Sequence, residues 1–136
     1  MTGQRRKARA IALQALYELD TTRHEVGGVV DRLLAEEGLS GDNNDFVHQL
    51  VGRAVQHRKE IDGSIQRFAP TWPVEQLSAI DRNILRLAIS EILFDNEVTV
   101  KVAINEAVEL AKKFGSENSS KFINGVLGSV SALARS

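Results

Sequence analysis

The sequence predicts an all-α fold of about seven helices, arranged as two packed helical subdomains. Apolar residues recur at intervals of three and four through most of the 136 residues, which is the period of a helix with one buried face. No useful length of chain alternates apolar and polar residues as a half-buried strand does. Both prolines, Pro70 and Pro73, lie close together, and such a break separates elements. We therefore expect one domain over 1–136, with an N-terminal subdomain at 1–70 and a C-terminal subdomain at 74–136.

The first predicted helix covers residues 4–19 and has an unusual charge at its start. Four cations stand in its first turns: Arg5, Arg6, Lys7 and Arg9. No acidic residue occurs before Glu18. The helix dipole favours anions at this end by a few tenths to about 1 kcal/mol per charge, so the sign is unfavourable for the helix alone. We therefore predict that this helix binds a polyanion, either RNA or DNA.

A helical wheel shows which residues of this helix share a face. With about 100° per residue, the apolar arc centres near Ala8, and Arg6 and Tyr17 fall on the opposite side. Arg5 and Arg9 lie at one flank. Tyr17 is therefore expected to be exposed in line with a cation, which suits phosphate contact together with base stacking. The alternative is that Tyr17 packs under a neighbouring helix and that the arginines only face solvent, as charge runs usually do.

Two further patterns complete the first half of the chain. Residues 29–34 form a short amphipathic helix that should end at Gly38, a usual residue just after a helix. From 46 to 55 apolar side chains recur at helical spacing, and the pattern continues weakly to Phe68. Gly63 is the candidate for a bend within it.

The second half begins with a clear helix start. Ser78 and Asp81 have the spacing of a capping box, in which a side chain accepts a hydrogen bond from a free backbone N–H group. Residues 80–93 are apolar around most of the helix circumference. A helix of that kind is expected to be central and covered by its neighbours.

The next helix, at 103–114, has one clean apolar stripe. Glu106 and Glu109 are expected to pair with Lys112 and Lys113 along its surface. The two lysines in the last turn and the glycine that follows suit a helix end.

The segment 116–122 is a second candidate for contact with nucleic acid. Its small polar residues suit a helix N-terminus, whose free N–H groups bind phosphate. Phe122 stands at the edge of the closing apolar stripe at 123–133 and could present its ring to a base. Core packing is the commoner use of such a residue.

The charge is unevenly distributed along the chain. There are 17 Lys and Arg against 18 Asp and Glu, a formal net charge of −1. Four of the cations precede the first acid, so the rest of the chain has 13 cations against 18 acids and a net −5. A basic strip on a mildly acidic body suits contact with a polyanion, and the acidic body suits a basic partner.

The sequence predicts no metal, no cofactor and no catalytic residues. His24, His48 and His57 share no ligand-like spacing. Gly-rich phosphate loops, a nucleophile elbow and a convincing pair of catalytic carboxylates are absent from the sequence. The chain is therefore not expected to be an enzyme.

Composition also bears on location. A chain with no Cys fits a reducing compartment such as the cytoplasm. No apolar run approaches the roughly 20 residues that span a bilayer, so no contact with membrane is expected. The basic start does not read as a signal peptide, because Gln14 and Glu18 interrupt its apolar residues.

Three blocks of the sequence resemble the NusB transcription antitermination family, and the resemblance covers nearly the whole chain. The first is RRKAR at 5–9 with QALY at 14–17. The second is DRNILR at 81–86 with Glu91. The third and most specific is VAINEAVELAK at 102–112 with FG at 114–115 and KFINGVL at 121–127.

The resemblance implies a seven-helix fold of two subdomains and a function by binding alone. Proteins of this family pair with NusE, which is also a small-subunit ribosomal protein, and bind the boxA element of nascent RNA. The complex joins other Nus factors on RNA polymerase and suppresses premature, chiefly Rho-dependent, termination in ribosomal RNA operons.

The resemblance also implies site residues by position. The Arg-rich RNA-binding helix of the family is matched by Arg5, Arg6, Lys7, Arg9 and Tyr17. A second RNA-contacting segment is matched by Asn118, Lys121 and Phe122. The acidic neighbourhood where RNA and NusE meet is matched by Glu75 and Asp81.

Two departures from the family pattern bear on affinity. The family often has Asp where Asn118 stands, and loss of that charge should lessen the repulsion of phosphate. The N-terminal basic run is shorter than in some relatives, which acts in the opposite direction. The sequence leaves open whether the protein is a monomer or a homodimer; a homodimer that covers the Arg-rich helix would be an autoinhibited store of the RNA-binding form.

Two other classes of function compete with this interpretation. One is a DNA-binding helical regulator, although no tight helix-turn-helix follows the basic segment and Tyr17 favours unpaired bases. The other is a helical adaptor that binds only protein and whose Arg-rich end is merely solvated. Binding of single-stranded RNA, scrambled RNA and duplex DNA, with and without NusE, separates the three classes.

Overall fold

The computed structural model describes residues 2–39, 41–71, 73–95 and 98–134, and Trp72 between the two prolines lies outside these ranges. The elements in chain order are α1 (Thr2–Thr21), α2 (Val26–Glu37), α3 (Gly41–Gln56), α4 (Arg58–Phe68), the short 3-10 helix η1 (Val74–Gln76), α5 (Ala79–Phe94), α6 (Val100–Phe114) and α7 (Ser119–Ala134). No strand occurs in the described part of the chain, which confirms the predicted all-α class. None of these helices is both long and apolar enough to cross a membrane.

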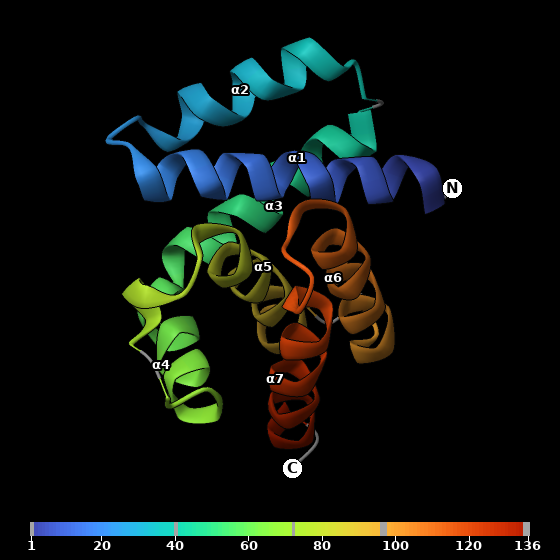
Figure 1. Cartoon of the computed structure of the whole chain (residues 1–136). Helices are drawn as coiled ribbons and strands as arrows, with labels where there is room; N and C mark the ends of the chain where they lie inside the picture. The colour runs from blue at the N-terminus through green and yellow to red at the C-terminus, as the bar shows by residue number, and fades with distance from the viewer. Residues whose placement is uncertain (1, 40, 72, 96–97, 135–136) are drawn as a thin grey trace.

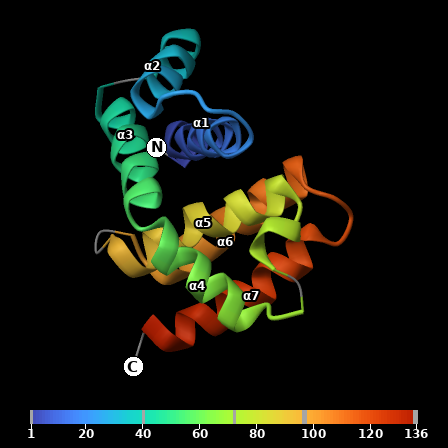
Figure 2. The same ribbon diagram turned by 90° about the vertical axis from the view of Figure 1, so that its left-hand side faces the viewer.

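The helices are arranged around α5. Figure 1 shows α1 lying across one end of α5, α6 and α7, with α2 on its far side, and Figure 2 shows α2 and α3 beside α1 in the turned view. Helix α5 packs against α1, α3, α4, α6 and α7. Because it touches helices on all sides, every residue from Asn83 to Ile92 is buried. The prediction of a central, covered helix is confirmed.

Helix α5 begins as its sequence predicts. Ser78 precedes the first turn, and its Oγ accepts a hydrogen bond from the backbone N–H of Asp81 at 3.1 Å. This bond satisfies one of the N–H groups that a helix start leaves free. The central helix therefore has a fixed N-terminus beside the turn that contains the two prolines.

The two halves of the chain share one hydrophobic core. Buried apolar residues from α1 through α7 form a single cluster. The chain does break at Pro70, but α4, which precedes that break, packs on α5 and α7. The division into subdomains at 1–70 and 74–136 therefore stays a prediction.

The expected bend at Gly63 is wrong. Helix α4 runs unbroken through Gly63, and the helical pattern breaks earlier, at His57. His57 has φ −103° and ψ 20°, and its ring stacks on Phe94 of α5 with centroids 3.9 Å apart. A helix tolerates the cost of about 0.5–1 kcal/mol that an exposed interior glycine carries, whereas the stacked ring fixes the change of direction between α3 and α4.

Two glycines are needed for geometric reasons. Gly38 ends α2 with φ 65°, a conformation that side chains disfavour, as the sequence predicts. Gly115 follows α6 at a close approach to α7: a Cβ at this position would lie 2.5 Å from the Cβ of Ser119 and 2.7 Å from the carbonyl oxygen of Ala111. The absence of a side chain at Gly115 lets α7 start directly against the end of α6.

Candidate nucleic-acid interface

The cations at the start of α1 contact other helices instead of forming a free basic end. Arg6 donates from Nε and Nη2 to the two carboxylate oxygens of Glu106 on α6, at 3.1 and 2.8 Å. Lys7 lies 3.4 Å from a carboxylate oxygen of Glu37 on α2, and both side chains are exposed. An exposed lysine pair of this kind contributes little to stability, so Lys7 remains available to another anion.

Arg9 is buried, which corrects the expectation that it lies at a solvent-facing flank of α1. Its Nε is 3.1 Å from each carboxylate oxygen of Glu91 on α5, and its Nη2 donates to one of them at 2.8 Å. Burial raises the pKa of Glu91, and the hydrogen bonds and charge of Arg9 oppose that rise. A guanidinium that is buried and held by Glu91 in this way does not reach a ligand on the surface.

Of the two arginines that the helical wheel places at one flank of α1, only Arg5 is still partly exposed. Its guanidinium carbon lies 4.1 Å from the ring centroid of Phe46 on α3, and that of Arg9 lies 5.2 Å from the same centroid. Contact with the face of an aromatic ring stabilises a guanidinium and fixes its plane. Arg5 is half-buried, so part of it still faces solvent.

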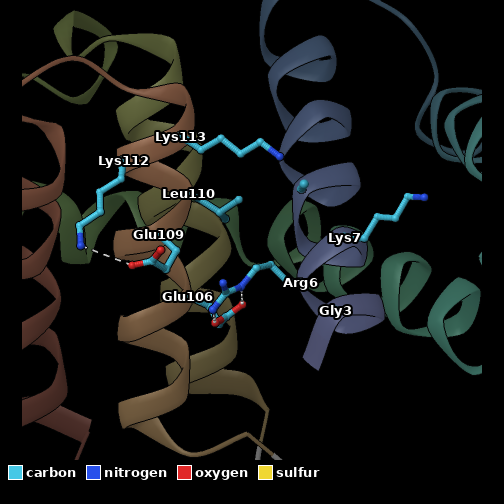
Figure 3. A pocket seen from close by; sticks show the side chains of 9 residues that line it. Gly3, Arg6, Lys7, Glu106, Glu109, Leu110, Lys112 and Lys113 are labelled. Atoms are coloured by element: carbon cyan, nitrogen blue, oxygen red, sulfur yellow. Dashed lines mark hydrogen bonds and ion pairs between the residues drawn. The ribbon is translucent and has the colours of Figure 1, made fainter. Parts of the chain in front are cut away.

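A groove of about 640 Å³ separates α1 from α6. Its lining is Gly3, Arg6, Lys7, Ala10, Glu106, Glu109, Leu110, Lys112 and Lys113. In Figure 3, Arg6 and Lys113 extend across the groove from opposite helices, while the side chains of Lys7 and Lys112 point outward, away from it. These four cations therefore border the groove from both helices, and we call Arg6, Lys7, Lys112 and Lys113 together the basic row.

The carboxylates of this groove pair differently from the prediction. Glu109 does pair with Lys112, at 3.4 Å, but Glu106 pairs with Arg6 on the other helix. The hydrogen bond from Arg6 lowers the pKa of Glu106 although burial opposes it, and the same bond raises the pKa of Arg6. Helical spacing indicates only partners on the same helix, so it could not identify this contact.

A second groove, of about 360 Å³, continues along α1 beyond the basic row. Tyr17 and Phe114 line this groove, and 41% and 37% of their respective surfaces are exposed. Its lining also includes Leu13, Leu33 and Ile80, so its walls are largely apolar. The exposure predicted for Tyr17 is confirmed, and the alternative in which it packs under a neighbouring helix is wrong.

The two grooves meet at the end of α6. Lys113 lines the first groove and Phe114 the second, and the Lys113 ammonium lies 5.3 Å from the Phe114 ring centroid. A cation next to an exposed ring is an arrangement that suits a nucleotide, which has a charged phosphate and a flat base.

The second predicted segment lies just beyond this point. Asn118 is exposed immediately before α7, and its carbonyl oxygen accepts from the N–H of Phe122 at 3.1 Å. Lys121 is exposed, whereas Phe122 is half-buried and packs against the core. These three residues do not line the groove between α1 and α6, but they follow its lining residues Lys112 and Lys113 by a few positions in the chain.

The two predicted acidic residues lie on η1 and at the start of α5. Glu75 is exposed on η1, and Asp81 is half-buried in the first turn of α5, next to the groove residue Ile80. The Oδ1 atom of Asp81 is buried, with no hydrogen-bond partner among the described residues. Contact of Glu75 and Asp81 with a partner stays a prediction.

The sequence reasoning missed the part of the surface that α6 supplies. Lys112 and Lys113 were explained by the helix end and by pairing with Glu106 and Glu109, and Phe114 by the apolar stripe. All three line the grooves. Their position shortly before the predicted segment 116–122 was the available signal. Among the described residues, no group of three or more His, Asp and Glu side chains could hold a metal ion.

Comparison with known proteins identifies the class to which this fold and surface belong. The sequence model of the NusB family matches residues 6–132. A transcription antitermination protein NusB of Dehalococcoides mccartyi is 57% identical over 131 residues, covering 96% of this chain and 92% of the relative. One from a Roseiflexus species is 50% identical and covers 96% of this chain and 93% of the relative. The chain belongs to the NusB family.

Solved structures agree with this assignment. NusB of T. maritima superposes with a TM-score of 0.88 at 32% identity, covering 94% of this chain and 90% of that one. A chain from a crystal structure of the antitermination factors NusB and NusE with double-stranded RNA superposes with a TM-score of 0.88 at 29% identity, covering 98% and 99%. The family therefore includes a member that has been crystallised with both a protein partner and RNA.

Proposed function

We propose that this protein is a transcription antitermination factor that acts by binding and not by catalysis. It binds single-stranded boxA-type RNA together with NusE, the small-subunit ribosomal protein, and so joins the Nus factors on RNA polymerase. There it suppresses premature termination in ribosomal RNA operons. The observation that carries RNA binding is the basic row, in which Arg6, Lys7, Lys112 and Lys113 gather from two helices beside a groove with exposed aromatic rings.

The proposed RNA contacts are of two chemical kinds, contacts to phosphate and stacking on bases. Arg5, Arg6 and Lys7 contact phosphate, and Tyr17 stacks on a base. The segment after α6 adds Asn118, Lys121 and Phe122, and the acidic neighbourhood of Glu75 and Asp81 faces NusE. Arg9 is assigned a positioning role, because its guanidinium is held by Glu91.

A binding comparison tests this function. Affinity is measured for boxA-type single-stranded RNA, the same RNA with its sequence scrambled, and duplex DNA, each with and without NusE. The expected result is the tightest binding to boxA-type RNA and a further gain when NusE is present. Equal weak binding to all three, unchanged by NusE, would instead favour the helical adaptor, and preference for duplex DNA would favour the DNA-binding regulator.

Arg6→Ala gives the sharpest single test of the basic row. The variant is expected to bind boxA-type RNA more weakly and to reduce the slope of log affinity against log salt by about one, because one fewer phosphate contact releases one fewer counterion. Arg23→Ala, an exposed arginine beyond the end of α1, is the control and should leave the slope unchanged. An unchanged slope in Arg6→Ala would mean that Arg6 does not contact phosphate.

A further inference from the structure

A ladder of alternating charges connects the core of the protein to the basic row. It consists of Glu91, Arg9, Glu106 and Arg6, from α5, α1, α6 and α1 respectively. The side chains of Glu91 and Arg9 are 2% and 6% exposed, that of Glu106 is 15% exposed, and that of Arg6 is 55% exposed. Exposure therefore rises at each step, and Arg6 is the most exposed of the four in the groove.

Each side chain of the ladder helps to orient the next one. Arg9 is held by three hydrogen bonds to Glu91 and has its Nη1 3.9 Å from Glu106. Glu106 in turn accepts two parallel hydrogen bonds from Arg6. A planar guanidinium and a planar carboxylate that meet in this way fix both their distance and their relative plane.

We propose that Glu106 is a positioning residue for RNA binding: its carboxylate holds the Arg6 guanidinium in the orientation in which Arg6 contacts phosphate. The inference rests on the proposed function. Glu106 uses the Nε and Nη2 groups of Arg6, and the two N–H groups of Nη1 are left to donate to a phosphate oxygen. Because Arg6 loses less conformational freedom when RNA binds, binding is tighter.

The negative charge of Glu106 could instead weaken binding by repelling phosphate. The exposures decide against this, because the Glu106 side chain is only 15% exposed and both of its carboxylate oxygens accept hydrogen bonds from Arg6, whose side chain is 55% exposed. Glu109 provides the contrast. It lines the same groove on the same helix, its side chain is 44% exposed, and its partner is the flexible Lys112. Repulsion of phosphate is expected from Glu109 and positioning from Glu106.

The test compares Glu106→Gln with Glu109→Gln, since both remove one negative charge from one groove. Affinity is measured for boxA-type single-stranded RNA. Glu106→Gln is expected to weaken binding about fivefold, because glutamine cannot accept two parallel hydrogen bonds from Arg6. Glu109→Gln is expected to leave the affinity unchanged or raise it slightly. Thermal unfolding of both variants verifies that they fold.

A double-mutant cycle with Arg6→Ala shows whether Glu106 acts through Arg6. In the Arg6→Ala background, Glu106→Gln should change affinity no more than Glu109→Gln does. The proposal is overturned if Glu106→Gln raises affinity as Glu109→Gln does, or if its fivefold effect persists without Arg6. Failure of the wild-type protein to bind the RNA would reject the proposed function itself and with it this inference. Wild-type binding with an inert Glu106→Gln would reject the inference alone.

Discussion

Arg6 and Arg9 lie three residues apart on α1 but have different environments and therefore different roles. Arg6 is half exposed and has a partner at the rim of the groove, whereas Arg9 is buried against Glu91. An exposed ion pair contributes about 0–1 kcal/mol to stability. Removing one member of a buried pair leaves an uncompensated charge and costs several times more.

Arg9→Ala is therefore expected to destabilise the protein by about 3–5 kcal/mol, whereas Arg6→Ala should cost much less because its ion pair is exposed to solvent. Urea unfolding at pH 7 measures both. The pKa of Glu91 is already above its ordinary 4.5, and loss of Arg9 should raise it further. Glu91 of the folded variant then keeps its proton to a higher pH than in the unfolded chain, so the variant should lose additional stability as the pH rises from 4.5 to the raised folded pKa. A cost for Arg9→Ala no larger than that for Arg6→Ala would mean that the buried pair is not essential to the fold.

Among the helices, α6 connects the parts of the proposed RNA surface. This helix supplies Glu106, Lys112 and Lys113 to the first groove. Its last residue is the exposed Phe114, and α7 starts a few residues later. The direction of α7 depends on the close approach at Gly115. The position of Asn118 and Lys121 relative to the basic row is therefore set by the corner between α6 and α7.

Gly115→Ala is expected to destabilise the protein by about 2 kcal/mol, because the added Cβ overlaps Ser119 and the backbone oxygen of Ala111. Thermal or urea unfolding measures the change. The control is Gly125→Ala on α7, where a Cβ meets nothing within 4 Å. That change should stabilise the helix by about 0.5–1 kcal/mol, so the two substitutions differ in sign. Stabilisation by both would show that the corner has room to relax.

At the scale of the whole molecule, a charged network joins α1 to α4 and α5. Asp20 at the end of α1 accepts hydrogen bonds from Arg82 at 2.6 Å and from Asn83 at 2.9 Å. Arg86 lies 3.4 Å from Asp20 and is also bonded to Asp62 on α4, at 2.8 and 3.0 Å. Burial raises the pKa of Asp20, but the hydrogen bonds and charges of these groups outweigh it and the net shift is downward.

This shift predicts how stability depends on pH. Because the folded pKa of Asp20 is below its ordinary 3.8, its contribution is complete above about pH 3.8 and is lost as the pH falls through the lowered folded value. Asp20→Asn should cost about 3 kcal/mol at pH 7, since Arg82 and Arg86 lose their shared anion. The difference from wild type should shrink in acid.

Urea unfolding at pH 7 and at several values below pH 4 tests this dependence. Asp45→Asn, at an exposed position on α3, is the control and should follow the wild type throughout. A gap between Asp20→Asn and wild type that stays constant down to pH 2.5 would contradict the linkage of Asp20 to folding.

Much of the fold was predictable because helix formation depends on local patterns. The period of apolar residues identified the helices, the all-round apolar surface of 80–93 identified the central one, and Ser78 and Gly38 marked helix ends correctly. The bend at Gly63 failed because a glycine permits a bend without requiring one. The break at His57 arises from a ring contact with Phe94, which is distant in sequence.

The candidate site was predictable only in part. By itself the sequence determined the cationic start of α1, the exposure of Tyr17 and the family. Tertiary structure alone decided that Arg9 is buried by Glu91, that Arg6 is held by Glu106, and that Lys112, Lys113 and Phe114 share grooves with α1. The physical reason is that a helical wheel assigns a residue to a face, whereas the burial of a charge depends on which opposite charge the fold brings within hydrogen-bonding distance.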